Sequence, residues 1–198
     1  VDEVRTRLGR LNVRYWLSGQ TGPEKAVYVV QSGDVLKRVA ARHDSTVELI
    51  HEANRMSGVV LQKGQRLVVP QGGFSAKVDR KLKRVLVYRK GQFFCQYPIR
   101  AMVGSASKPV KEGVAPVKVK VAEGFGWRSN LRVGSLEKGY RDEGVVPWLA
   151  TNPGGHTFFS DVSGAGENTR PASGYELEAE HVRELSALLR RGDEVLIR

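Results

Sequence analysis

The segment from Val27 to Pro70 most constrains the fold, because its sequence pattern predicts four successive elements. β-Branched and aromatic residues fill Val27 to Val30, which predicts a strand that ends in a turn at Ser32-Gly33. Asp34 stands where a helix N-cap belongs. Apolar residues then recur at helical spacing: Leu36, Val39 and Ala40. We therefore expect a helix directly after the first strand.

A second helix and a second strand follow in the same segment. Ser45 precedes Glu48 by three residues, as in a capping box, and Asn54 predicts the end of this helix. Its apolar face comprises Leu49, Ile50 and Ala53. Lys63-Gly64 then predicts a turn into a strand from Arg66 to Val69. The predicted order is strand, helix, helix, strand.

This order and the residues that produce it resemble a LysM domain. The matching positions extend over the full module: Tyr28, Val30, Gly33, Asp34, Leu36, Val39, Ala40, Leu49, Asn54, Leu61, Gly64, Gln65, Leu67, Val69 and Pro70. The sequence departs from the family at Val35, where threonine is usual. This change removes one possible hydroxyl contact and leaves the fold assignment intact.

The resemblance implies a glycan-binding groove. LysM modules bind glycans that contain N-acetylglucosamine, chiefly peptidoglycan, between the loop before the first helix and the loop after the second. The implied glycan-binding residues are Gly33, Asp34, Val35, Leu36, Asn54, Arg55, Met56 and Ser57. Taken singly, Gly33, Asp34 and Asn54 are more typical of a turn and two helix caps. The binding assignment therefore rests on their joint position in the family pattern.

Composition and charge limit the possible partners. The 198 residues allow one or two domains, and no apolar run approaches the ~18 residues that cross a bilayer. The net charge of +11 favours an anionic partner. Because no nucleic-acid-binding motif accompanies this charge, we expect anionic polymers of the bacterial cell envelope rather than nucleic acid. No apolar signal-peptide core precedes Val27, so we expect any export signal to be absent from these residues.

The residues before this segment predict a weakly amphipathic basic helix followed by a linker. Its apolar positions are Val4, Leu8 and Leu11, interspersed with arginines. Such a helix can lie on a membrane, dock on its own protein or begin a longer linker. We expect the linker at Ser18 to Pro23, where glycine and proline cluster.

Residues 74–198 have the patterns of a mostly β unit. The alternating stretch from Ala76 to Arg89 predicts a strand with its run of lysines and arginines on a solvated edge, and Phe93 to Ile99 predicts the return strand. Val114 to Val121 predicts a further strand. Apolar spacing predicts a helix over Glu178 to Arg190, before a last strand at Glu194 to Ile197.

This half resembles the catalytic domain of L,D-transpeptidases, the YkuD-type domain. The stretches that carry the resemblance are Val78 to Gly104, Pro147 to Asp161 and Ser173 to Ile197. The predicted fold class is α+β, with a small βααβ LysM module followed by a mostly β L,D-transpeptidase-like domain with one C-terminal helix. The predicted division is 1–26 for the N-terminal helix and linker, 27–70 for the LysM module and 74–198 for the second domain.

The residues required by the family's chemistry are replaced in this sequence. Family enzymes attack a stem peptide with a cysteine thiolate, and a histidine takes the thiol proton. The aligned positions hold Tyr175 for the cysteine, Phe159 for the histidine and Leu177 for a following arginine. A phenol with a pKa near ~10 beside an apolar ring cannot substitute for a thiolate and its base. We therefore predict no catalytic residues at this site.

Two alternatives to a catalytically inactive binding protein remain at this point. An active L,D-transpeptidase or a peptidoglycan hydrolase with a displaced catalytic site would use Ser173 or His156, which lie close in sequence to the expected nucleophile and base. A purely structural pair of domains would bind no glycan. Cys95 is expected to be buried and inert, and we expect neither a metal nor a cofactor. Wall stem peptides or a partner envelope enzyme are further possible partners.

Overall fold

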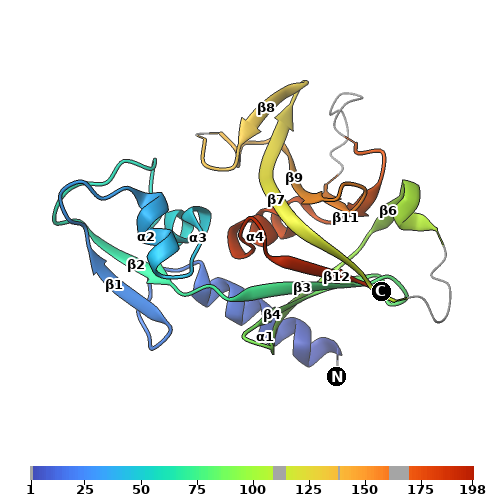
Figure 1. Cartoon of the computed structure of the whole chain (residues 1–198), viewed down its shortest axis with the longest axis horizontal. Helices are drawn as coiled ribbons and strands as arrows, with labels where there is room; N and C mark the ends of the chain where they lie inside the picture. Colours follow the sequence, from blue (N-terminus) through green and yellow to red (C-terminus); the bar gives the residue numbers. More distant parts are fainter. Residues whose placement is uncertain (1, 109–114, 138, 161–169) are drawn as a thin grey trace.

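The computed structural model describes residues 2–108, 115–137, 139–160 and 170–198. These residues form an α+β protein with a two-stranded sheet at one end and a ten-stranded sheet at the other (Figure 1). The predicted α+β class is confirmed. No helix in the described ranges is both long enough and apolar enough to cross a membrane.

The small unit, residues 25–70, has the predicted strand, helix, helix, strand order. Strand β1 (Lys25–Val29) pairs antiparallel with β2 (Arg66–Pro70), and helices α2 (Leu36–Arg42) and α3 (Val47–Ala53) lie between them in sequence. Its core is aliphatic: Val30, Leu36, Val39, Ala40, Ile50, Leu67 and Val69. Four of the apolar positions that predicted the helices, Leu36, Val39, Ala40 and Ile50, pack in this core, whereas Leu49 packs in the core of the large unit.

The starts of both helices differ from the prediction by one residue. Val35, not Asp34, is the N-cap of α2, because the Asp34 carboxylate accepts from the Gln31 amide at 2.8 Å and closes the preceding turn. Thr46, not Ser45, caps α3, and its hydroxyl accepts from the Leu49 amide at 2.8 Å. The capping-box prediction was therefore wrong. The predicted end of α3 is confirmed, with the C-cap at Asn54.

The large sheet has the strand order β5-β4-β3-β12-β7-β9-β10-β11-β6, with β8 paired to β7. Most pairs are antiparallel, and the parallel pairs are β3 with β12 and β10 with β11. Its strands are β3 (Phe74–Asp79), β4 (Arg84–Arg89), β5 (Gln92–Pro98), β6 (Ala101–Val103), β7 (Val117–Arg128), β8 (Leu131–Gly134), β9 (Val146–Asn152), β10 (Thr157–Phe159), β11 (Gly174–Glu176) and β12 (Glu194–Ile197). The short helix η1 (Gly104–Ser107) follows β6.

The predicted single strand from Ala76 to Arg89 was wrong, because this stretch is a hairpin. Strands β3 and β4 pair antiparallel, with Val78 opposite Val85. The turn between them contains Lys83 with a positive φ of 47°. Part of the basic run thus lies in a turn instead of along a strand edge. The predicted return strand corresponds to β5, and the first residue of the strand predicted from Val114 lies outside the described residues.

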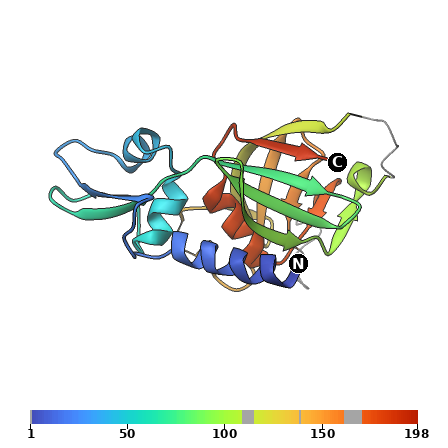
Figure 2. The same cartoon turned by 90° about the horizontal axis from the view of Figure 1, so that it is seen from below.

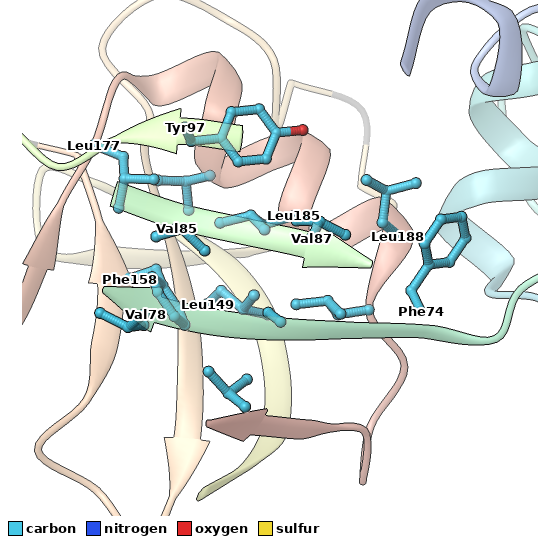
Figure 3. Close-up of a cluster of buried hydrophobic side chains, with 14 of the residues drawn as sticks. Phe74, Val78, Val85, Val87, Tyr97, Leu149, Phe158, Leu177, Leu185 and Leu188 are labelled. Carbon is cyan, nitrogen blue, oxygen red and sulfur yellow. The ribbon is translucent and has the colours of Figure 1, made fainter. Parts of the chain in front are cut away.

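Helix α4 (Ala179–Leu188) fills the concave side of the large sheet. Figure 3 shows Leu185 of this helix beside Val87 and Leu188 beside Phe74, and all four belong to one buried cluster with Val78 and Val85. The predicted C-terminal helix and last strand are both present. The described residues thus form two hydrophobic cores, an aliphatic one in the small unit and a larger mixed aliphatic and aromatic one around α4.

The N-terminal helix α1 (Asp2–Trp16) docks on the large sheet, which decides among the three predicted placements (Figure 2). The side-chain amide of Asn12 on this helix donates to the Phe94 carbonyl of β5 at 2.8 Å. A Cβ at Gly9 would lie 3.0 Å from the Cys95 backbone, so glycine permits this close approach. The predicted apolar positions Val4, Leu8 and Leu11 are exposed, because the helix buries the face of Gly9, Val13 and Trp16 instead.

Candidate functional site

A cavity of about 510 Å³ opens beside the start of α2. Its lining is mainly aliphatic and comes from four places in the chain: Asp34 to Lys37, Val47, Val59 to Leu61, and Leu136. Val60 is 84% exposed, and Val35 and Val59 are about half exposed. Exposed aliphatic side chains that converge on one cavity are typical of a binding surface.

The cavity includes part of the predicted glycan site. Asp34, Val35 and Leu36 line it, and Leu36 is also buried in the core of the small unit. Gly33 precedes them with a positive φ of 82°, a conformation that glycine adopts without strain. The end of the loop before α2 and the start of that helix thus form one side of the cavity.

The Asp34 carboxylate holds this loop in place. It accepts hydrogen bonds from the Tyr28 hydroxyl at 2.5 Å and the Gln31 amide at 2.8 Å, and Arg42 lies 3.5 Å away. The hydrogen bond from Tyr28 is the main cause that lowers the pKa of Asp34. These hydrogen bonds and the nearby arginine hold the Asp34 side chain in place, so Asp34 fixes the loop that contains Val35.

Gly33 and the four predicted residues after the second helix do not line this cavity. The Asn54 amide donates to the carbonyls of Ile50 and Val68, both at 2.7 Å, and its oxygen accepts from the Val68 amide at 2.8 Å. Asn54 therefore ties α3 to β2. Met56 packs against the core of the small unit. Arg55 and Ser57 are exposed outside the cavity lining.

The sequence prediction missed Val47, Val59, Val60 and Leu61 on the second wall. The two adjacent valines of this loop supplied a signal, since a loop rich in polar residues does not otherwise need an exposed aliphatic pair. Leu136 could not be predicted from the LysM-like pattern, because it belongs to the C-terminal part of the chain, residues 74–198. Its place in the lining depends on how the two parts pack.

Tyr175 on β11 is a core residue with two polar neighbours, His156 and Arg80. The parallel pairing of β10 with β11 places Tyr175 opposite Phe158, and the Tyr175 hydroxyl lies 3.0 Å from Nδ1 of His156. Burial raises the pKa of Tyr175 to about 12, and the charge of Arg80 partly opposes this shift. Burial, together with Arg80, lowers the pKa of His156. Both groups are therefore neutral near pH 7.

The three positions aligned with the transpeptidase signature are filled by buried side chains. Tyr175 and Phe159 are 0% exposed, and Leu177 is 1% exposed. Tyr175 and Leu177 belong to the large core together with Phe158 (Figure 3 shows Leu177 and Phe158). Apolar packing thus occupies the positions where the family pattern has its reactive groups.

Ser173 and His156 lie near each other in the fold, but their hydrogen bonds go to other groups. The Ser173 hydroxyl donates to the Gly155 carbonyl at 2.7 Å, accepts from the Ala106 amide at 3.1 Å and lies 2.7 Å from the Ser105 hydroxyl. These contacts join η1 to the turn before β10. Within the described ranges, the hydrogen-bond partner of His156 is Tyr175.

Cys95 on β5 is buried, as expected. Burial is the main cause that raises the pKa of its thiol to about 12. The thiolate required of a nucleophile is therefore disfavoured near neutral pH.

Sequence comparison identifies the small unit. Residues 28–70 match the family model of the LysM domain. This part of the chain is a LysM domain. The cavity beside α2 is thus a cavity of that domain, and its lining extends to Leu136 beyond it. No curated protein matches the chain.

Solved structures resemble the fold at low sequence identity. An L,D-transpeptidase (Yku) from Stackebrandtia nassauensis is 20% identical, with a TM-score of 0.40 over 64% of this chain and 55% of that one. An L,D-transpeptidase from Mycobacterium smegmatis is 12% identical, with a TM-score of 0.41 over 68% and 63%. A mutant of the L,D-transpeptidase from Enterococcus faecium is 11% identical, with a TM-score of 0.42 over 100% and 82%. The chain thus spans less than two thirds of the length of the first two.

Proposed function

We propose that this protein binds peptidoglycan glycan strands in the bacterial cell envelope through the cavity of its LysM domain. The observation that carries the proposal is the convergence of exposed Val35, Val59 and Val60 on one cavity of a LysM domain. N-Acetylated sugars present apolar ring faces and acetamido methyl groups, which aliphatic side chains can cover. The net charge of +11 favours approach to anionic wall polymers.

We further propose that the C-terminal part contributes no transpeptidase chemistry. Tyr175, Phe159 and Leu177 support this proposal, because all three are buried in place of the groups that the resemblance requires. Neither the phenol nor the buried Cys95 thiol ionises near neutral pH, since burial raises the pKa of each to about 12. This part of the chain then acts as a scaffold for the glycan-binding domain or for a wall peptide.

The alternative function is an enzyme that uses Ser173 with His156. The proximity of both residues at the end of the β10–β11 pair favours this alternative. The hydrogen bonds of Ser173 to Gly155 and Ala106 argue against it, because general-base activation requires a serine bonded to the histidine. We therefore propose glycan binding, not catalysis by Ser173 and His156, as the function of this protein.

Cosedimentation of the full chain with insoluble peptidoglycan tests the binding proposal. We expect the wild-type protein to sediment with the polymer, and the variant Val60→Asp to bind at least about tenfold more weakly, because a carboxylate enters the aliphatic surface. Val27→Asp is the matched control, since Val27 is also exposed but lies outside the cavity lining. Equal loss in both variants, or no retention of the wild type, would contradict the proposal.

Release of D-alanine from tetrapeptide muropeptides tests the proposal about chemistry. We expect no release above the rate without protein. Release that disappears in the double variant Ser173→Ala with His156→Ala would establish the alternative enzyme and overturn the scaffold proposal.

A further inference from the structure

We propose that the glycan site is shared between the two parts of the chain, with Leu136 of the C-terminal part forming one wall. This inference rests on the proposed function of the LysM cavity. Leu136 lines that cavity together with Val35, Val59 and Val60, although it lies far from them in sequence. A glycan in the cavity would therefore contact both parts of the protein at once.

Leu136 is held in a short turn after β8. The Glu137 amide donates to the Gly134 carbonyl at 3.0 Å, and the Glu137 carboxylate accepts from the Gly134 amide at 3.0 Å. This closed turn projects from the hairpin of β7 and β8. The turn thus presents its central residues, Ser135 and Leu136, as a defined structure.

A hydrogen bond fixes the turn against the LysM domain. The Ser135 hydroxyl donates to the Glu48 carboxylate of α3 at 2.8 Å. Glu48 follows Val47, which lines the same cavity as Leu136. This contact between the two parts is therefore adjacent to the proposed glycan site.

Further polar contacts hold the two parts in this arrangement. Arg141 donates to the Glu52 carboxylate of α3 at 3.0 Å and also to Glu180 of α4 at 3.1 Å. The Thr46 hydroxyl donates to the Ala187 carbonyl, and Arg190 pairs with Asp44. On the LysM side these contacts come from α3 and the residues just before it, and on the other side from α4 and the residues near it. The position of Leu136 is thus fixed by a network, not by one side chain.

The chemistry of Leu136 matches its neighbours in the cavity. Its isobutyl group adds aliphatic surface to a lining that already contains four valines and two other leucines: Val35, Val47, Val59, Val60, Leu36 and Leu61. Burying aliphatic surface against a sugar ring or an acetamido methyl group stabilises the complex in proportion to the area removed from water. Leu136 is therefore a binding residue that the LysM pattern alone does not contain.

Calorimetric titration of the full chain with the tetramer of N-acetylglucosamine tests this inference. We expect Leu136→Ala to weaken binding by about fivefold and Leu136→Asp by at least about tenfold. Leu131→Asp is the matched control, because Leu131 lies on the same hairpin, is 71% exposed and does not line the cavity. We expect this control to bind like the wild type.

A second measurement separates contact with the glycan from an effect on folding. The methyl resonances of Leu136 should shift when the wild-type protein is titrated with the tetramer, while those of Leu131 should not. Ser135→Ala should weaken binding by less than Leu136→Asp, because it removes the hydrogen bond to Glu48 but leaves the aliphatic wall in place.

The outcomes distinguish this inference from the function on which it rests. If the wild type binds, Val60→Asp loses affinity and the Leu136 methyl groups do not shift, then the shared site is wrong and the LysM function stands. If the wild type binds neither the tetramer nor peptidoglycan, both proposals are wrong. Methyl shifts at Leu136 together with weaker binding by Leu136→Ala would support the shared site.

Discussion

The LysM cavity and the surroundings of Tyr175 use apolar side chains in opposite ways. In the cavity, Val35, Val59 and Val60 are exposed although they lie next to a well-packed core. Around Tyr175, the side chains at the transpeptidase signature positions are fully or almost fully buried. The first region leaves apolar surface available for a ligand, whereas the second uses it for stability. This difference supports the proposal that the protein binds glycan through the first region and has no transpeptidase chemistry in the second.

The largest effect is expected from Tyr175→Ala, which tests whether this ring is part of the core. Removing a fully buried aromatic side chain leaves a cavity and should lower the free energy of unfolding by about 3–5 kcal/mol. Tyr175→Phe removes only the hydroxyl that lies beside His156 and should cost about 1 kcal/mol. Urea denaturation measures both values. A loss below about 1 kcal/mol for Tyr175→Ala would mean that the ring does not support the core.

A smaller effect is expected from Asn54→Ala, which sharpens the account of the LysM domain. The Asn54 amide bonds to backbone groups of Ile50 and Val68, so its loss should lower the free energy of unfolding by about 1–3 kcal/mol. Arg55→Ala is the control, and it should change stability by less than about 0.5 kcal/mol because Arg55 is exposed. If Asn54→Ala instead weakened glycan binding without changing stability, Asn54 would be a direct ligand contact.

The smallest effect is expected in the pH dependence of the free energy of unfolding, through His156 beside Tyr175. Burial is the main cause that lowers the pKa of His156 in the folded protein. The unfolded chain therefore takes up a proton near pH ~6.5 while folded His156 remains neutral. The free energy of unfolding should then fall as pH falls from 7.5 to 6.0. Urea denaturation should give a smaller fall for His156→Gln, and an unchanged fall would show that this histidine is not involved.

Local patterns predicted the LysM domain well, because its elements are short and close in sequence. Val39 and Ile50 are buried at helical spacing, as the pattern required. The N-cap of α3 was missed because Ser45 and Thr46 are adjacent, and the sequence does not decide which hydroxyl accepts from the helix amide. The basic run before Arg84 was misassigned because a hairpin turn and a strand edge both favour charged residues.

The composition of the proposed site was only partly predictable from the sequence. Asp34, Val35 and Leu36 follow from their place before and at the start of α2, whereas Leu136 depends on contacts between distant parts of the chain. The location of Asn54 also required the structure, because an asparagine at a helix end can bond either to a ligand or to its own backbone. In the structure its side-chain amide forms hydrogen bonds with backbone groups of α3 and β2.

The contrast between the two regions can be measured most directly by amide chemical shifts during titration of the full chain with a soluble peptidoglycan fragment. The account predicts shifts at Val35, Val59 and Val60 that saturate with the fragment, and no shifts at His156 or Tyr175. Shifts at His156 and Tyr175, with the LysM cavity unchanged, would contradict it.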